Sequence, residues 1–259
     1  MSLETMLQYI PAYVMTVFRI AGMMIFAPLF GSSRIPRRVK AMFVLVAAFG
    51  MIASVRTPVQ LPDTTWGLTA AIAGELSFGL AMGMAVMFVF IAAQWAGEML
   101  GQQIGFNISE VLDPAFGQAG SLMGDLYFMF TLVIFLLVGG HHAMLLGVHE
   151  SFKVAAPGQL GVTAGLLDAL VGMLSVATSL AFRLAAPMFI TMLVVSLAMG
   201  CISKTMPQFN ILSAGLALRA IVGIVVVLVS VALTAEVIKE GVLDTLADLR
   251  TLWINPTPG

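Results

Sequence analysis

The sequence predicts an all-α, polytopic membrane protein with about six long hydrophobic helices. Of its 259 residues, 60% are hydrophobic and only 10% are charged, and the mean hydropathy is +1.03. Soluble domains carry about 25% charged residues, so this composition excludes an ordinary soluble domain. A membrane-spanning helix needs about 20 mainly apolar residues, and the apolar segments of the chain are sufficient for five or six such helices.

Six apolar segments follow one another along the chain, at about residues 10–30, 41–55, 68–93, 122–138, 166–202 and 211–237. The second has 15 residues, which as a helix would be only about 22 Å long, so it is short for a span unless it extends back to Pro36. In the third, Gly79 and Gly83 have a spacing that would let another helix approach closely. Residues 139–161 indicate a polar turn, and an amphipathic tail follows the sixth segment.

The strongest positive cluster in the chain predicts its topology. Arg34, Arg37, Arg38 and Lys40 follow the first apolar segment within one short loop. Cytoplasmic loops of membrane proteins carry an excess of Lys and Arg. We therefore expect residues 34–40 to lie in the cytoplasm.

Four charged residues lie in or beside the apolar segments: Arg19, Glu75, Arg183 and Arg219. A charge at the centre of a membrane helix costs about 2.5–3.5 kcal/mol on insertion scales. Four such charges indicate surfaces that face protein or water, as in a transporter with a polar pathway or in one subunit of a larger bundle. Arginines that reach from helix ends to the membrane surface are a simpler account of Arg183 and Arg219.

Composition and motifs argue against several other classes of protein. The net charge of −1 excludes a basic nucleic-acid-binding surface. Cys201 is the single cysteine, so no disulfide framework or cysteine zinc cluster can form. Phosphate-binding glycine motifs and nucleophile motifs are absent from the sequence, so we expect neither an enzyme nor a bound cofactor.

Two groups of polar residues deserve a chemical interpretation. His141, His142, His149 and Glu150 lie close in sequence, but they lack the His-Glu-x-x-His spacing of zinc proteases, and we expect no metal site. Glu98, Glu110 and Asp113 could form a carboxylate relay, although a solvated or hydrogen-bonded loop edge is the simpler interpretation.

The stretch from Gly97 to Gln118 is the one around which the other segments are arranged. It starts with helix-forming residues and a Gly97-x-x-x-Gly101 spacing, and then becomes irregular from Gly105, while staying apolar and free of Lys and Arg. Non-helical backbone at membrane depth is tolerated only where protein buries it or where it lines a cavity. The stretch is therefore a candidate pore constriction, with a re-entrant or interfacial connector as the alternative.

Three blocks of sequence, in order, resemble the FliR family of flagellar export-gate proteins, called SctT in virulence injectisomes. The first runs from Gly97 to Phe106 and is followed by Asp113-Pro114. The second contains Gly140-His141-His142 and ends in His149-Glu150-Ser151-Phe152. The third contains Ala185-Ala186-Pro187, then Leu197-Ala198-Met199-Gly200, then Met206-Pro207-Gln208-Phe209-Asn210. The match extends over the length of the chain, and it favours the flagellar branch.

The resemblance implies a non-enzymatic component of the flagellar type III export gate in the bacterial inner membrane, at the flagellar basal body. In that family one such chain combines with FliP- and FliQ-type subunits into a channel for unfolded flagellar proteins, with an FlhB-type protein on the cytoplasmic side. Residues 1–165 would correspond to a FliP-like part and residues 166–259 to a FliQ-like helical hairpin with an amphipathic tail, together forming one integrated domain.

The resemblance also assigns roles to particular residues. The channel plug of the family maps onto residues 105–118, where the sealing and hinge residues would be Gly105, Phe106, Ile108, Val111, Phe116 and Gly117. The residues of the assembly and turn motif would be Pro187, Gly200, Pro207, Gln208 and Asn210. Two other classes stay open: a small-solute secondary transporter coupled through Glu75 or Glu98, and a structural membrane scaffold without a pore.

Overall fold

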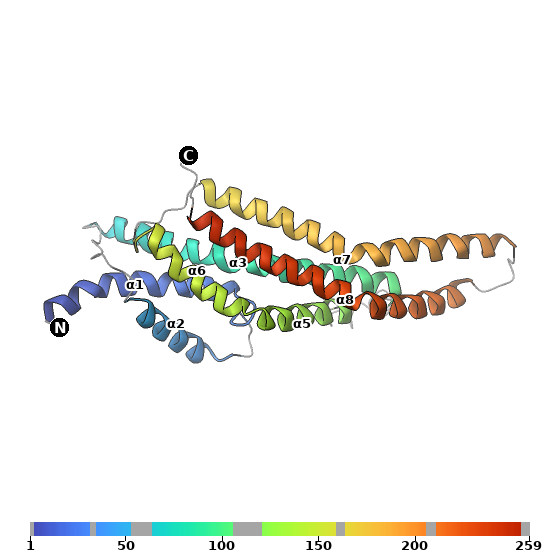
Figure 1. Ribbon diagram of the computed structural model, residues 1–259, viewed down its shortest axis with the longest axis horizontal. Coiled ribbons are helices and arrows are strands. Elements are labelled where there is room, and N and C mark those ends of the chain that lie inside the picture. Colours follow the sequence, from blue (N-terminus) through green and yellow to red (C-terminus); the bar gives the residue numbers. More distant parts are fainter. Residues whose placement is uncertain are drawn as a thin grey trace. The chain divides into compact units, whose positions relative to one another are not determined.

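The described part of the chain is entirely helical. The computed structural model describes residues 3–31, 35–52, 64–105, 121–158, 164–205 and 211–254, and no strand occurs in these ranges. Figure 1 shows the order of the helices: α1 (Leu3–Phe26), α2 (Arg37–Met51), α3 (Thr65–Ile104), α5 (Leu122–Leu137), α6 (Gly140–Val154), α7 (Ala164–Thr205) and α8 (Ile211–Ile254). The predicted all-α class is confirmed.

Four of the described helices are long and apolar enough to cross a membrane. The candidate spans are Tyr9–Phe26, Thr65–Ile104, Leu170–Thr205 and Gly215–Asp248, and a fifth is present if α5 and α6 together form one broken span. Helix α2 begins directly after Pro36 and has 15 residues, so it stays below the length of a span, as its sequence indicates. The polytopic membrane class is therefore confirmed.

Helix α6 corrects the prediction of a polar turn at residues 139–161. Residues 140–154 are helical, and the helix starts after Gly139, whose φ of 75° is in the left-handed region. Its buried positions recur every three or four residues: Gly140, Met144, Gly147, Val148, Ser151 and Phe152. This spacing places them on one side of a helix, so the histidines and Glu150 belong to a packed helix rather than to a connecting turn.

The positive cluster is also placed differently from the prediction. Arg37, Arg38 and Lys40 lie in the first turn of α2 rather than in a loop, and the two arginines are exposed. Arg34 lies outside the described residues. The cytoplasmic position of this cluster stays a prediction.

The chain divides into two compact units, and the first comprises Met1–Phe88, Leu136–Ser175 and Val242–Gly259. Within it, α1 packs on α2 and on the first half of α3. Tyr13 donates a hydrogen bond to the Leu45 carbonyl at 3.2 Å, and the rings of Phe30 and Phe43 lie 4.8 Å apart between centroids. The division at residue 165 that the family resemblance implies stays a prediction.

The second unit comprises Val89–Phe135 and Val176–Gly241, and it contains an antiparallel hairpin of α7 and α8. Three glycines of α8 lie next to α7 side chains in reverse order: Gly215 faces Met199, Gly223 faces Met192 and Gly241 faces Leu180. A helix that carries glycine at these positions lets long side chains of its neighbour lie against its backbone. The two helices run side by side in Figure 1.

Much of the apolar surface of this hairpin is not covered by the described part of the chain. In an 18-residue apolar window of each helix, only 17% is buried in α7 and only 6% in α8, although both windows are strongly apolar. Monomeric soluble proteins rarely leave apolar patches of such extent exposed. Lipid or other protein subunits therefore have to cover these faces.

Candidate functional site

A buried ion pair between α1 and α3 is the most elaborate polar feature of the described residues. Nε of Arg19 donates to Oε2 of Glu75 at 2.6 Å, and Nη2 donates to Oε1 at 3.0 Å. Both side chains have no exposed surface. A two-pronged arginine–carboxylate contact of this kind fixes the geometry of both groups as well as pairing their charges.

The ion pair also binds α6 and the turn that follows it. Nη1 of Arg19 donates to Oγ of Ser151 at 2.8 Å, and Nη2 reaches the Ala155 carbonyl at 3.4 Å. The backbone N–H of Gly158 donates to Oε1 of Glu75 at 2.7 Å. Gly158 has a φ of 85°, a conformation that glycine adopts without steric cost. One arginine and one glutamate thus tie together four segments of the first unit.

Two aromatic rings complete the surroundings of Arg19. The guanidinium carbon lies 5.1 Å from the ring centroid of Phe78 and 4.4 Å from that of Phe152. Cations are attracted to ring faces at such distances, and the planar guanidinium can stack on them. Because the charge is both paired and hydrogen-bonded, the large cost of removing it from water is offset.

Close contact between α1 and α3 brings the two charges together. An added Cβ on Gly79 would overlap the Arg19 carbonyl oxygen, and one on Gly22 would overlap the Leu76 carbonyl oxygen. Gly83 is packed in the same way against Met23. The structure therefore confirms that the Gly79–Gly83 spacing serves close helix packing, and it identifies α1 as the neighbour.

The two remaining arginines of the apolar segments have different surroundings. Arg219 is half-buried and donates through Nη2 to Oγ of Ser196 at 3.1 Å, across the α7–α8 hairpin. Arg183 is exposed on α7. Of the four charges that the sequence singles out, only Arg19 and Glu75 are therefore brought together.

The second candidate site is the pair of helix ends that flank the predicted plug. Helix α3 ends at Ile104, and Gly105 has a φ of 92° while its N–H bonds to the Gly101 carbonyl at 3.0 Å. Such a glycine after the last helical residue is a common way to end a helix. Residue 105 is where the sequence predicts that the irregular stretch begins.

The other end of the stretch is fixed by Ser121, which caps α5. Its hydroxyl accepts a hydrogen bond from the N–H of Gly124 at 3.3 Å, and its carbonyl accepts one from Asp125 at 2.9 Å. Side-chain capping of this type satisfies N–H groups that lack partners at the start of a helix. Gly105 and Ser121, the described residues on either side of the 106–120 segment, thus both take part in defined hydrogen bonds.

Glycines also hold the end of α3 against the start of α5. An added Cβ on Gly97 would overlap the Met123 carbonyl oxygen, and one on Gly124 would lie 2.9 Å from Cγ of Glu98. The two helices that carry the ends of the segment therefore touch backbone to backbone. This contact is the structural role of Gly97, the first residue of the Gly97–Gln118 stretch.

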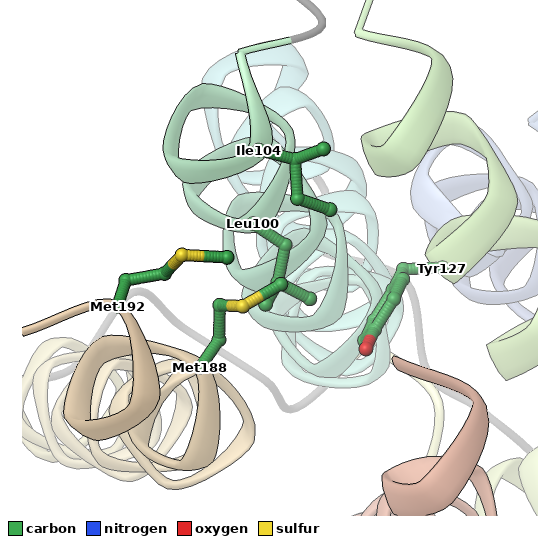
Figure 2. Packing of buried hydrophobic residues seen from close by; sticks show 5 residues of the cluster. All are labelled: Leu100, Ile104, Tyr127, Met188 and Met192. Atoms are coloured by element: carbon green, nitrogen blue, oxygen red, sulfur yellow. The ribbon is translucent and has the colours of Figure 1, made fainter. Parts of the chain in front are cut away.

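A hydrophobic cluster lies beside the end of α3. Figure 2 shows its five residues from three helices: Leu100, Ile104, Tyr127, Met188 and Met192. Ala220, Val226 and Val227 of α8 pack against it. The Tyr127 side chain is also hydrogen-bonded to that of Thr234. Ile104, the residue before Gly105, is 1% exposed, so the base of the predicted plug is anchored in a packed core.

Most of the other predicted site residues fall outside the part of the chain that the structure describes. Outside the described residues lie Phe106, Ile108, Val111, Phe116, Gly117, Pro207, Gln208 and Asn210, together with Glu110 and Asp113 of the possible relay. Pro187 is half-buried within an unbroken α7, and Gly200 is exposed near its end. Their roles in plugging and assembly stay predictions.

The histidine group gives no sign of a metal centre. Within the described ranges, no three residues of His, Cys, Asp or Glu are arranged to hold a metal ion. His141 and His142 are exposed at the start of α6, whereas His149 and Glu150 are half-buried further along it.

The fold and these sites define a class: a polytopic α-helical membrane protein with a buried ion pair in its first unit and apolar faces that its described residues leave uncovered. Residues 10–245 match the family described as bacterial export proteins, family 1. The chain belongs to this family, which confirms the resemblance to FliR.

Flagellar biosynthetic proteins and a surface presentation of antigens protein are among the similar sequences. The chain is 25% identical to the flagellar biosynthetic protein FliR of Bacillus subtilis (strain 168), over 96% of this chain and 97% of that one. It is 24% identical to FliR of Escherichia coli (strain K12), over 95% of each chain. It is 22% identical to the surface presentation of antigens protein SpaR of Shigella flexneri, over 82% of each.

Proposed function

We propose that this protein is a subunit of the flagellar type III export gate in the bacterial inner membrane. It would form, with FliP- and FliQ-type subunits, the channel through which unfolded flagellar proteins leave the cell, and would contact an FlhB-type protein on the cytoplasmic side. The main support is the family match over residues 10–245. The 6% burial of an 18-residue apolar window of α8 supports assembly with other subunits, because the described residues cover little of this part of the helix.

The segment between α3 and α5 is proposed to seal this channel. It is apolar, and its ends are fixed by Gly105 and Ser121. Apolar constrictions close pores by excluding water as well as by steric blockage. Phe106, Ile108, Val111 and Phe116 are the side chains we propose for the seal, with Gly105 and Gly117 providing backbone freedom on either side.

The geometry of Glu75 argues against the alternative of a solute transporter coupled through this residue. Both carboxylate oxygens of Glu75 accept hydrogen bonds from Arg19, and one also accepts from Gly158. A coupling carboxylate has to exchange its ion or proton during transport, and here that step would break the packing of four segments. The carboxylate is better suited to a fixed structural role.

Purification of the tagged chain from its native membrane in mild detergent tests the assembly. We expect a large, stable particle that contains FliP- and FliQ-type proteins, identified by mass spectrometry. A particle that contains only this chain would contradict the proposed assembly. The wild-type particle is also the reference for the tests that follow.

Substitutions in the segment test the seal separately. We expect serine at Phe106, Ile108, Val111 and Phe116 together to leave the particle intact but to make membranes permeable to small ions, measured as conductance in planar bilayers. Leucine at the same four positions is the matched control, because it keeps the segment apolar, and it should stay closed. Equal conductance in the serine, leucine and wild-type particles would rule out the sealing role.

A further inference from the structure

Arg183 is a cation in the interior of an apolar helix without a partner in the described part of the chain. About 20 Å of helix separate it from Leu170, where the candidate span of α7 begins, and the span continues to Thr205. The residue is exposed, and no hydrogen bond or ion pair joins it to another described residue. Its surroundings therefore differ from those of Arg19 and Arg219, each of which has polar partners.

Arg183 lies on a side of α7 that the chain's own core does not cover. The buried residues of this part of α7 recur at helical spacing, at Ala177, Leu180, Ala181, Leu184, Ala185, Met188 and Met192. Ser179, one turn before Arg183, is exposed. Residues four apart lie on one side of a helix, so Ser179 and Arg183 form a small polar patch that points away from the core.

Lipid is an unsuitable neighbour for this patch. An arginine at the centre of a membrane helix costs about 2.5–3.5 kcal/mol on insertion scales. Snorkelling reduces that cost for arginines near helix ends, but Arg183 lies in the interior of the candidate span, which continues on both sides of it from Leu170 to Thr205. Charged residues inside membranes generally pair with one another, and this chain pairs Arg19 with Glu75 in that way.

We propose that Arg183 binds a carboxylate of a partner subunit within the membrane. The partner is an apolar helix that carries an Asp or Glu and packs on the α7 side formed by Ser179 and Arg183. The positive charge of Arg183 selects an acidic partner, and the exposed neighbour Phe182, with 58% of its surface accessible, supplies apolar contact. This inference rests on the proposed assembly and identifies one of its contacts.

Cross-linking identifies the occupant of this surface. The photoreactive amino acid benzoylphenylalanine is placed at Ser179 in the full chain, and the particle is irradiated in native membranes before purification. We expect a cross-link to an apolar segment of a partner subunit that contains an Asp or Glu. Cross-links only to lipid, or to residues 106–120 of the same chain, would overturn the proposal.

Charge changes then test the ion pair itself. We expect Arg183→Gln to lower the yield of assembled particle by about tenfold or more, because an unpaired carboxylate would remain buried in the partner. Arg183→Lys should retain most of the yield. Lys204→Gln removes an exposed cation from the last turn of the same helix and should leave the yield at the wild-type level.

Charge reversal distinguishes an ion pair from a general packing defect. We expect Arg183→Glu to abolish assembly, and Arg or Lys at the cross-linked acidic residue of the partner to restore it. If Arg183→Gln assembles as well as Lys204→Gln, or if the reversed pair gives no recovery, the ion pair is refuted. The proposed function would survive either result, because the wild-type particle with FliP- and FliQ-type proteins is measured independently.

Discussion

Replacement of Glu75 by Gln tests whether the buried ion pair holds the first unit together. The glutamine side chain has nearly the same shape, but it is neutral and has an N–H₂ group where the carboxylate accepts a hydrogen bond from Arg19. Arg19, which has no exposed surface, would keep its contacts to Ser151 and the Ala155 carbonyl but lose its counter-charge. The variant therefore leaves a buried charge uncompensated.

The expected loss of stability is large. Removing one member of a buried ion pair costs about 3–5 kcal/mol. For a chain of this size, each kcal/mol corresponds to about 2–4 °C in the unfolding midpoint, so we expect a decrease of about 6–20 °C. The assay is thermal unfolding of the purified full-length protein in detergent, followed by intrinsic fluorescence and by the fraction that remains monodisperse after heating.

An exposed ion pair on α8 provides the control. Lys239 and Glu236 are 3.1 Å apart, and their side chains are 48% and 58% exposed, so Lys239→Gln should shift the midpoint by only about 1–2 °C. A similar small shift for Glu75→Gln would refute the reasoning. The double variant Arg19→Met, Glu75→Leu should recover part of the loss, because apolar replacement of both partners removes the uncompensated charge.

Two glycine substitutions are expected to act through backbone geometry. Gly79→Ala should lower the unfolding midpoint by several degrees, because its Cβ would overlap the Arg19 carbonyl. Its control is Gly50→Ala, which has no atom within 4 Å of the added Cβ and should be neutral or slightly stabilising. Equal effects of the two substitutions would contradict the close packing of α1 on α3. Gly105→Ala should lower the free energy of unfolding by about 1–2 kcal/mol, because the φ of Gly105 is 92°. Its control is Gly200→Ala, which lies within a helix and in open space. A Gly105→Ala variant as stable as the control would show that the helix end does not need this conformation.

Local sequence signals predict the class, the long helices and the onset of the irregular stretch. The composition and length of the apolar segments are sufficient to predict the class and the long helices. The break at Gly105 follows from the change in residue type along the chain, and its positive φ agrees with the use of glycine there. These features depend on residues that are neighbours in sequence.

Helix α6 shows where polarity misled the prediction. Its histidines and Glu150 suggest a turn, yet Met144, Val148 and Phe152 recur every four residues and are buried. This period was available in the sequence. The Gly-Gly-His-His start favours a turn instead, and the structure uses it to begin a helix after Gly139.

The pairing of Arg19 with Glu75 could not be predicted from the sequence. The two residues are 56 positions apart, and pattern analysis shows only that each lies in an apolar segment. Their contact depends on the approach of α1 to α3 through glycines of both helices. For the same reason the partners Ser151 and Gly158, from a different part of the chain, carried no detectable signal.

The separation of the two charges along the chain bears on how the protein is made. Arg19 leaves the ribosome well before Glu75, because synthesis proceeds from the N-terminus. During that interval α1 carries a cation without its carboxylate, which disfavours full insertion by about 2.5–3.5 kcal/mol. We therefore expect the first helix to stay close to the insertion machinery or the membrane surface until α3 emerges, so that the two helices enter the bilayer as a neutral pair.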